Sequence, residues 1–113
     1  MVQHGNAKQV VDFYHRQVQG KCTVEGRTCK MLTCIAKVTV HWCNNNEFAI
    51  ERDCKDFGDH LEHILDNCTT RTSLPTHQWV RGLAEDKDGY YIEMGQAKGK
   101  RELDQCTGKK VGW

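Results

Sequence analysis

The chain has 113 residues, of which 38% are hydrophobic and 27% are charged, and its net charge is +1. This length predicts one domain spanning 1–113, and the composition is typical of a globular protein rather than a disordered one. The small net charge gives no field that would attract nucleic acid or a membrane surface, and no apolar run is long enough to span a bilayer. We therefore expect neither a membrane span nor a nucleic-acid partner.

The first predicted element is a helix over residues 7–19. Asn6 can serve as its N-cap, Gln9 completes a capping-box pattern, and Gly20 follows the last turn. The expected buried stripe of this helix contains Val10, Val11, Phe13, Tyr14 and Val18. The polar segment 20–33 is then expected to be a loop.

A β-hairpin is predicted over residues 34–52. Apolar and polar residues alternate through 34–43, and the branched and aromatic side chains there favour a half-buried strand. Three asparagines at 44–46 predict a turn, because asparagine tolerates left-handed backbone angles. The alternation then resumes, and Phe48 and Ile50 are expected to point inward.

A second helix is predicted over residues 54–68, with Asp53 as its cap. Its apolar residues recur at a spacing of three and four, which indicates one buried stripe made of Phe57, Leu61, Ile64, Leu65 and Cys68. Cys68 should face the core, where a disulfide would fix the end of the helix. Cys54 lies on the order of 20 Å away along the axis, so these two cysteines cannot pair with each other.

A second hairpin is predicted over residues 77–95, with strands at 77–84 and 90–94. Asp88-Gly89 between them is a strong signal for a chain reversal. Residues 96–113 form a basic tail, for which we expect solvent exposure and anchoring through Cys106. Its basic residues are Lys98, Lys100, Arg101, Lys109 and Lys110.

The order of these elements is helix, hairpin, helix, hairpin. This order predicts an α+β fold, in which a four-stranded antiparallel sheet from two hairpins carries two helices. The expected fold is also stapled by disulfides, for the following reason.

Cysteine is the most informative residue type in this chain. No C-x-x-C pair is present, so the usual zinc-finger spacings are absent, and this cysteine density in a short chain favours a disulfide framework formed in an oxidising compartment. A secreted, extracellular protein is the inference. One cysteine must remain unpaired, and choosing it and then pairing the other six leaves 105 arrangements open, three intramolecular bridges being the simplest outcome. The candidates are Cys22, Cys29, Cys34, Cys43, Cys54, Cys68 and Cys106.

A metal site is one alternative for the second helix. His60 and His63 are three residues apart, with Asp59 and Glu62 beside them. These residues lie outside the apolar stripe, and the sequence identifies no third ligand. We therefore expect a solvated helix face, and neither a metal nor another cofactor.

Ribonuclease chemistry is a second alternative. It requires a general base, a general acid and a cation for the phosphate, and this chain offers His41, Glu47, Arg52, His77 and Arg81. Nothing in the sequence fixes their mutual geometry. No catalytic residue is therefore assigned, and a non-enzymatic protein is expected.

The segment 43–68 carries a family resemblance. The run Trp-Cys-Asn-Asn-Asn at 42–46, the pair Asp53-Cys54 and the helix that ends at Cys68 resemble small cysteine-rich proteins secreted by fungi. These include effectors delivered to host plants and killer toxins with α/β sandwich folds. The resemblance implies a secreted α+β protein without catalytic residues that binds a host or competitor protein. The seventh cysteine departs from the even count expected in such proteins.

Three functions are consistent with these observations. The first is a secreted, non-enzymatic effector or virulence protein that binds a host target, and that is host-delivered if the resemblance holds. The alternatives are a secreted killer toxin or antimicrobial protein, and a small secreted ribonuclease-like hydrolase. The target, the oligomeric state and the disulfide pairing stay open at this point.

Overall fold

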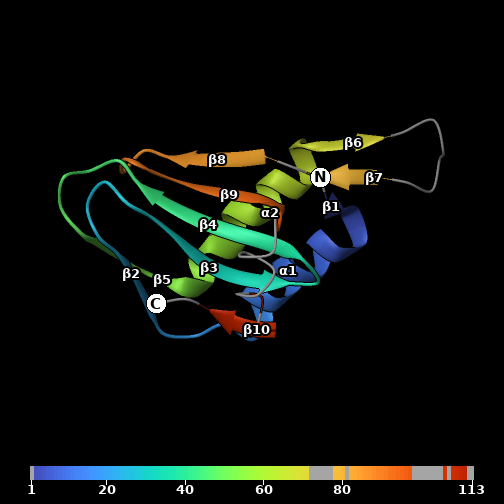
Figure 1. Cartoon of the computed structure of the whole chain (residues 1–113), viewed down its shortest axis with the longest axis horizontal. Helices are drawn as coiled ribbons and strands as arrows, with labels where there is room; N and C mark the ends of the chain where they lie inside the picture. Colours follow the sequence, from blue (N-terminus) through green and yellow to red (C-terminus); the bar gives the residue numbers. More distant parts are fainter. Residues whose placement is uncertain (1, 72–77, 81, 98–105, 107, 112–113) are drawn as a thin grey trace.

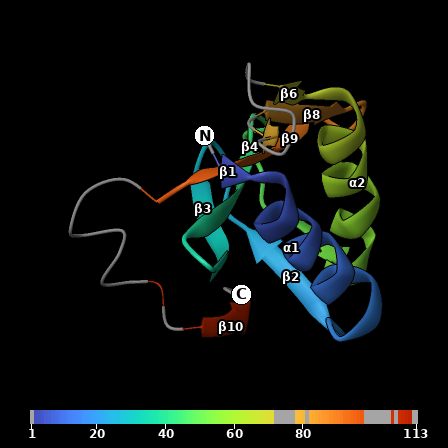
Figure 2. The same cartoon turned by 90° about the vertical axis from the view of Figure 1, so that its right-hand side faces the viewer.

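The computed structural model of this chain describes residues 2–71, 78–80, 82–97, 106 and 108–111. Two helices, α1 (His4–Arg16) and α2 (Phe57–Asn67), lie on one face of a five-stranded antiparallel sheet (Figures 1 and 2). In spatial order, the strands of this sheet are β10 (Gly108–Val111), β3 (Cys29–Ile35), β4 (Val38–Asn44), β9 (Tyr90–Gln96) and β8 (Gly82–Asp86). Neither described helix is long and apolar enough to cross a bilayer.

Two smaller sheets flank the main one. In the first, β2 (Lys21–Val24) pairs with β5 (Ile50–Asp53), and a 3-10 turn, η1 (Cys54–Asp56), then leads into α2. In the second, the strand order is β1 (Val2–Gln3), β7 (Gln78–Val80) and β6 (Thr69–Arg71). The predicted α+β class is confirmed, whereas the prediction of one four-stranded sheet made from two hairpins is wrong.

The predicted first hairpin, 34–52, does not form. The chain instead reverses at Ala36 and Lys37, so that β3 pairs with β4, and β5 pairs with β2 instead of β4. Ala36 and Lys37 have φ angles of 50° and 65°, the left-handed values that a two-residue hairpin turn needs at both positions. Segment 20–33 is accordingly not a loop, because it contains β2 and most of β3.

The predicted second hairpin is confirmed for its larger part. Strands β8 and β9 pair antiparallel, and Gly89 adopts the positive φ of 85° in the turn between them. The predicted strand at 77–84 is divided, since β7 belongs to the smaller sheet with β1 and β6.

Both helices lie in the predicted parts of the chain, but their boundaries differ: residues 17–19 follow α1, and residues 54–56 form η1 instead of the start of α2. Helix α1 begins at His4, with Gln3 rather than Asn6 at its N-cap, and ends at Arg16. Asp53 makes no capping hydrogen bond, because its carboxylate pairs with Lys21 Nζ at 2.6 Å. The five stripe residues predicted for the first helix are buried, and so are the four apolar ones of α2 that precede Cys68.

The core lies between the helices and the inner face of the sheet. Its largest fully buried side chains include Trp42, Tyr14 and Phe57, and the Trp42 and Phe57 ring centroids are 4.7 Å apart. The Tyr14 hydroxyl is hydrogen-bonded to the buried hydroxyl of Thr33 on β3. Burial raises the pKa of Tyr14 well above its usual value, so this phenol stays neutral and ties α1 to the sheet.

Three disulfides cross-link the chain, as the simplest arrangement predicts. They are Cys22–Cys54, Cys29–Cys43 and Cys34–Cys106. The predicted role of Cys68 as a staple is wrong: its thiol is free, and it packs half-buried against the core beside Gly82. Part of the basic tail lies outside the described residues, but β10 and the Cys34–Cys106 bridge attach the rest to β3.

Candidate functional site

Three loops meet at one end of the sheet, at the left of Figure 1, and we call residues 25–28, 44–49 and 86–90 the loop end. The buried side chain of Asn44 holds two of these loops together. Its amide donates to Glu25 O at 3.2 Å and to Phe48 O at 2.8 Å, and its oxygen accepts from Asn46 N at 2.9 Å. Asn44 therefore holds the backbone of its own loop, at Asn46 and Phe48, and that of the neighbouring loop at Glu25.

Asn46 connects the same loop to the β8–β9 turn. Its side-chain amide donates to Asp88 O at 2.8 Å, while Asn45 N donates to Gly89 O at 2.9 Å. A glycine is required at position 89, because its φ is positive and a Cβ there would lie 2.8 Å from the Asn46 oxygen. The Cys29–Cys43 bridge at the base of the loops completes a cross-linked unit.

Phe48 is the exception within this unit, because its side chain is 64% exposed although its backbone is fixed. The sequence predicted an inward Phe48. That prediction is wrong because 45–49 is a loop and β5 starts only at Ile50, which is buried as predicted. Among the described residues, the other exposed large hydrophobic side chain is that of Leu83, which is 46% exposed.

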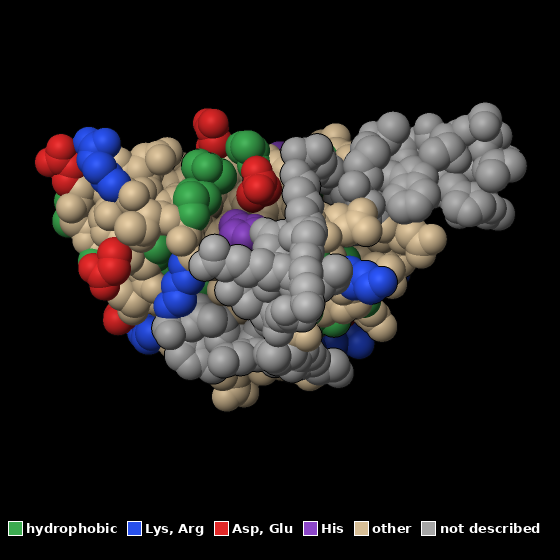
Figure 3. All heavy atoms as spheres, viewed as in Figure 1, with side chains coloured by type: hydrophobic (Ala, Val, Ile, Leu, Met, Phe, Trp, Pro, Cys, Tyr) green, Lys and Arg blue, Asp and Glu red, His purple; other side chains and the backbone are tan. Residues whose placement is uncertain are grey.

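Leu83 belongs to the outer face of the sheet, opposite the helices. It pairs across the strands with Glu93, which in turn pairs with His41 on β4. Figure 3 views this face and shows hydrophobic, acidic and histidine side chains lying among one another. The apolar side chains here are interrupted by charged ones, unlike the continuous inner face.

A half-buried polar network connects the loop end to α2. His60 Nε2 lies 3.0 Å from Asp86 Oδ2, and Arg52 pairs with Asp88 at 3.1 Å while its guanidinium lies over the Tyr90 ring, 5.6 Å from the centroid. Burial, reinforced by the Asp86 charge, raises the pKa of Tyr90 to about 12. The side chains in this network pair with one another, which suits a structural role.

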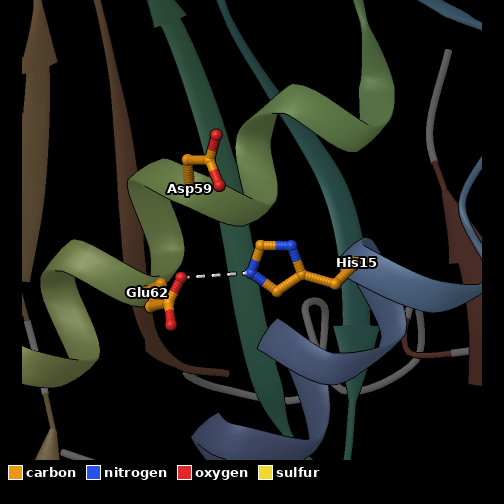
Figure 4. A group of neighbouring side chains, drawn as sticks. All are labelled: His15, Asp59 and Glu62. Atoms are coloured by element: carbon orange, nitrogen blue, oxygen red, sulfur yellow. Dashed lines mark ion pairs between the residues drawn. The ribbon is translucent and has the colours of Figure 1, made fainter.

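The two helices form the second group of interest, which we call the helix seam: His15 on α1, with Gly58, Asp59 and Glu62 on α2. The imidazole of His15 points across to α2, and Figure 4 shows both carboxylates lying on its side of that helix. His15 Nε2 is 3.4 Å from Glu62 Oε2, and the ligand atoms of His15, Asp59 and Glu62 all lie within 4.8 Å of one another. This geometry is that of a candidate metal centre.

The sequence did not identify this group. It placed Asp59 and Glu62 next to His60 and His63, but His60 is engaged by Asp86, and the histidine that joins the carboxylates comes from α1. A local spacing pattern cannot predict that two helices 40 or more residues apart in the chain pack side by side. The glycine at 58, on the packed face of α2, is the one local hint of a close approach.

A hollow of about 390 Å³ adjoins the seam where α1 ends. It is lined by basic side chains including Arg16 and Lys55, with His15 shared between the hollow and the seam. Asp53 at its edge is paired with Lys21, whose hydrogen bond and charge hold the pKa of that carboxyl below its usual value.

The residues considered for ribonuclease chemistry are not assembled in the described part of the chain. Glu47 pairs with Arg27 at 3.1 Å, and Arg52 pairs with Asp88, whereas His41 lies on the outer face of the sheet. His77 and Arg81 lie outside the described residues.

Comparison with known proteins places this chain beside none of them: no protein-family model, curated protein or solved structure matches it.

Proposed function

We propose that this protein is a secreted effector that acts by binding a target protein of a host through the loop end, with Phe48 as the central contact. The observation that carries the proposal is a large aromatic side chain presented to solvent on a cross-linked backbone. Loops fixed on a rigid scaffold commonly carry binding residues, and aromatic side chains dominate the binding energy of protein interfaces.

The fixed backbone favours binding because little conformational entropy is lost when a partner docks. Hydrogen bonds from Asn44 and Asn46 already order the loop, so the partner does not have to order it. Full burial of a phenylalanine side chain contributes about 1.5–3 kcal/mol. That amount corresponds to roughly ten-fold or more in affinity.

Secretion is supported by the disulfides. Six of the seven cysteines are paired, and bridges of this kind form and persist in oxidising compartments. The α+β fold with a helix following Asp53-Cys54 is also compatible with the resemblance to secreted fungal proteins.

The first test is photo-crosslinking with the oxidised protein. A photoreactive phenylalanine analogue at position 48 is exposed to extracellular fluid from plant leaf, the host type that the resemblance implies, and the same analogue at position 83 is the matched control. We expect one protein to crosslink at position 48 and not at 83. Equal labelling at both positions would show that the loop end has no special role.

The second test measures affinity for that protein. Phe48→Ala should weaken binding by about ten-fold or more, and Leu83→Ala should leave it within about two-fold, although both variants remove an exposed apolar side chain. An affinity that is unchanged in Phe48→Ala contradicts the proposal.

A killer toxin could use the same exposed aromatic residue against a competitor. Growth of competing microbial cells in the presence of the purified protein separates the two functions, because an effector should be inert there. Growth inhibition that is lost in Phe48→Ala would favour the toxin. The described residues supply no observation that favours a ribonuclease.

A further inference from the structure

We propose that His15, Asp59 and Glu62 form a binding site for a divalent cation of the zinc class, which bridges α1 and α2. One imidazole nitrogen and two carboxylate oxygens are a donor set that zinc accepts. Calcium and magnesium instead favour six or more oxygen ligands, so the imidazole selects against them.

The geometry needs little adjustment. Tetrahedral ligands 2.0–2.1 Å from zinc are roughly 3.3 Å apart, and His15 Nε2 and Glu62 Oε2 are already 3.4 Å apart. The widest separation within the group is no more than 4.8 Å. Small torsional adjustments of the exposed Asp59 side chain can supply the remaining change of at most about 1.5 Å.

The orientation of His15 is set by the packing of the two helices. A Cβ built on Gly58 would lie 3.0 Å from both Nδ1 and Cε1 of His15, so the imidazole rests directly on the α2 backbone. The glycine therefore permits a close approach that directs Nε2 toward the two carboxylates. A ligand whose ring is held in this way loses less side-chain entropy when it binds a metal.

The charges also favour a dication. Asp59 and Glu62 are three residues apart on one helix face, where like charges repel. Within the described part of the chain, Glu62 pairs with His15, whereas Asp59 makes no ion pair. A dication would neutralise both carboxylates, and the exposed position leaves room for water as a further ligand.

Isothermal titration of the oxidised full chain with Zn²⁺ tests this site. We expect one ion per chain and weaker binding of Ca²⁺. His15→Ala, Asp59→Asn and Glu62→Gln should each lower the zinc affinity by at least about ten-fold, since loss of a supporting group alone costs 10–100-fold. The matched controls, His63→Ala and Asp66→Asn on the same helix, should stay within two-fold of the wild type.

The free thiol of Cys68 is the competing ligand, and Co²⁺ serves as the spectroscopic probe. Co²⁺ bound at the seam should show no thiolate charge-transfer absorption, and Cys68→Ser should retain full zinc affinity. Thermal unfolding in zinc at 100 times its Kd should lower the unfolding constant about 100-fold for the wild type and not for His15→Ala. Zinc binding that survives His15→Ala, depends on Cys68, or is absent from the wild type overturns the proposal.

Discussion

The loop end and the helix seam show opposite ways of leaving a group available at the surface. At the loop end, the side chains of Asn44 and Asn46 make hydrogen bonds within the protein, and the large apolar group exposed to solvent is the ring of Phe48. At the seam, the apolar side chains of both helices are buried in the core, and the side chains exposed to solvent are polar: His15, Asp59 and Glu62. The side chains exposed to solvent in each region indicate the chemistry of the ligand that the region would accept.

The sharpest test of this contrast compares two phenylalanines. Phe57→Ala should lower the free energy of unfolding by about 3–5 kcal/mol, because Phe57 is fully buried against Trp42 and its removal leaves a cavity. Phe48→Ala should change it by less than about 0.5 kcal/mol, as expected for a surface site. Urea unfolding measures both. Comparable losses would mean that Phe48 is part of the packing and is not free to bind.

The disulfides provide the next comparison, since each region has its own. Cys22–Cys54 closes a separation of 32 residues next to α2, and Cys29–Cys43 closes 14 at the base of the loop end. Loop-closure entropy predicts losses of about 4 and about 3 kcal/mol when both cysteines of a pair are replaced by serine. Equilibrium unfolding should preserve this order, and the reverse order would show that strain or residual structure outweighs chain entropy.

Acid pH should act on the fold at Asp86, which connects the loop end to His60 on α2. Burial raises the pKa of Asp86, but hydrogen bonds from the Asp88 backbone and from His60 outweigh it and hold that pKa below its usual value. The ionised carboxylate therefore stabilises the fold above the ordinary aspartate pKa of about 3.9, and this contribution is lost as the pH falls through the lower folded-state value.

Ionised Asp86 should contribute less than about 1 kcal/mol to the free energy of unfolding, because its side chain is partly exposed and solvent screens its charge. Unfolding followed between about pH 5 and pH 2 should show a shallower slope for Asp86→Asn than for the wild type. Asp66→Asn, at an exposed carboxylate of α2, is the control. An unchanged slope in Asp86→Asn would remove this network from the link between the loop end and α2.

The smallest expected effect on stability is that of Gly58→Ala. Alanine is favoured over glycine in a helix interior by up to about 1 kcal/mol, and by less in the first turn, where Gly58 lies. The new Cβ also displaces the His15 ring, so the two effects nearly cancel in the free energy of unfolding. Zinc affinity, in contrast, should fall several-fold. Gly5→Ala on α1, where a Cβ meets nothing within 4 Å, should leave zinc affinity unchanged. Equal zinc affinity in both variants would show that the glycine does not position His15.

The parts of the fold that were predicted correctly depend on local patterns. The stripe of α2 and the turn at Asp88-Gly89 each follow from residues close together in the sequence. The reversal at Ala36 and Lys37 could not be predicted, because neither residue is typical of left-handed turns and the tertiary structure imposes those angles. Because that turn was not predicted, the segment of β5 was paired with the strand at 34–43 instead of with β2. Strand pairing of this kind depends on residues far apart in the chain.

The candidate sites were less predictable still. Phe48 continues an alternating pattern that predicts a core residue. In the structure its segment is a loop, held by hydrogen bonds from Asn44 to Glu25 and to Phe48 and from Asn46 to Asp88. His15 joins Asp59 and Glu62 only after α1 and α2 pack together. Both sites arise from packing between distant segments, which no motif in the chain encodes.

The Cys34–Cys106 bridge joins residues far apart in the chain, so it can form only after nearly the whole chain has been synthesised. Cys29 and Cys43 are released from the ribosome close together, and Cys22 can find Cys54 soon afterwards, but Cys34 has to wait for Cys106, which is 72 residues downstream. Cys68 emerges during this interval as a second thiol that could capture Cys34 wrongly. Early packing of α2, which places Cys68 against Gly82, would shelter it until the correct partner is made. If the bridges form as the chain emerges, the packing of Cys68 against the core would limit its access to Cys34 before Cys106 is available.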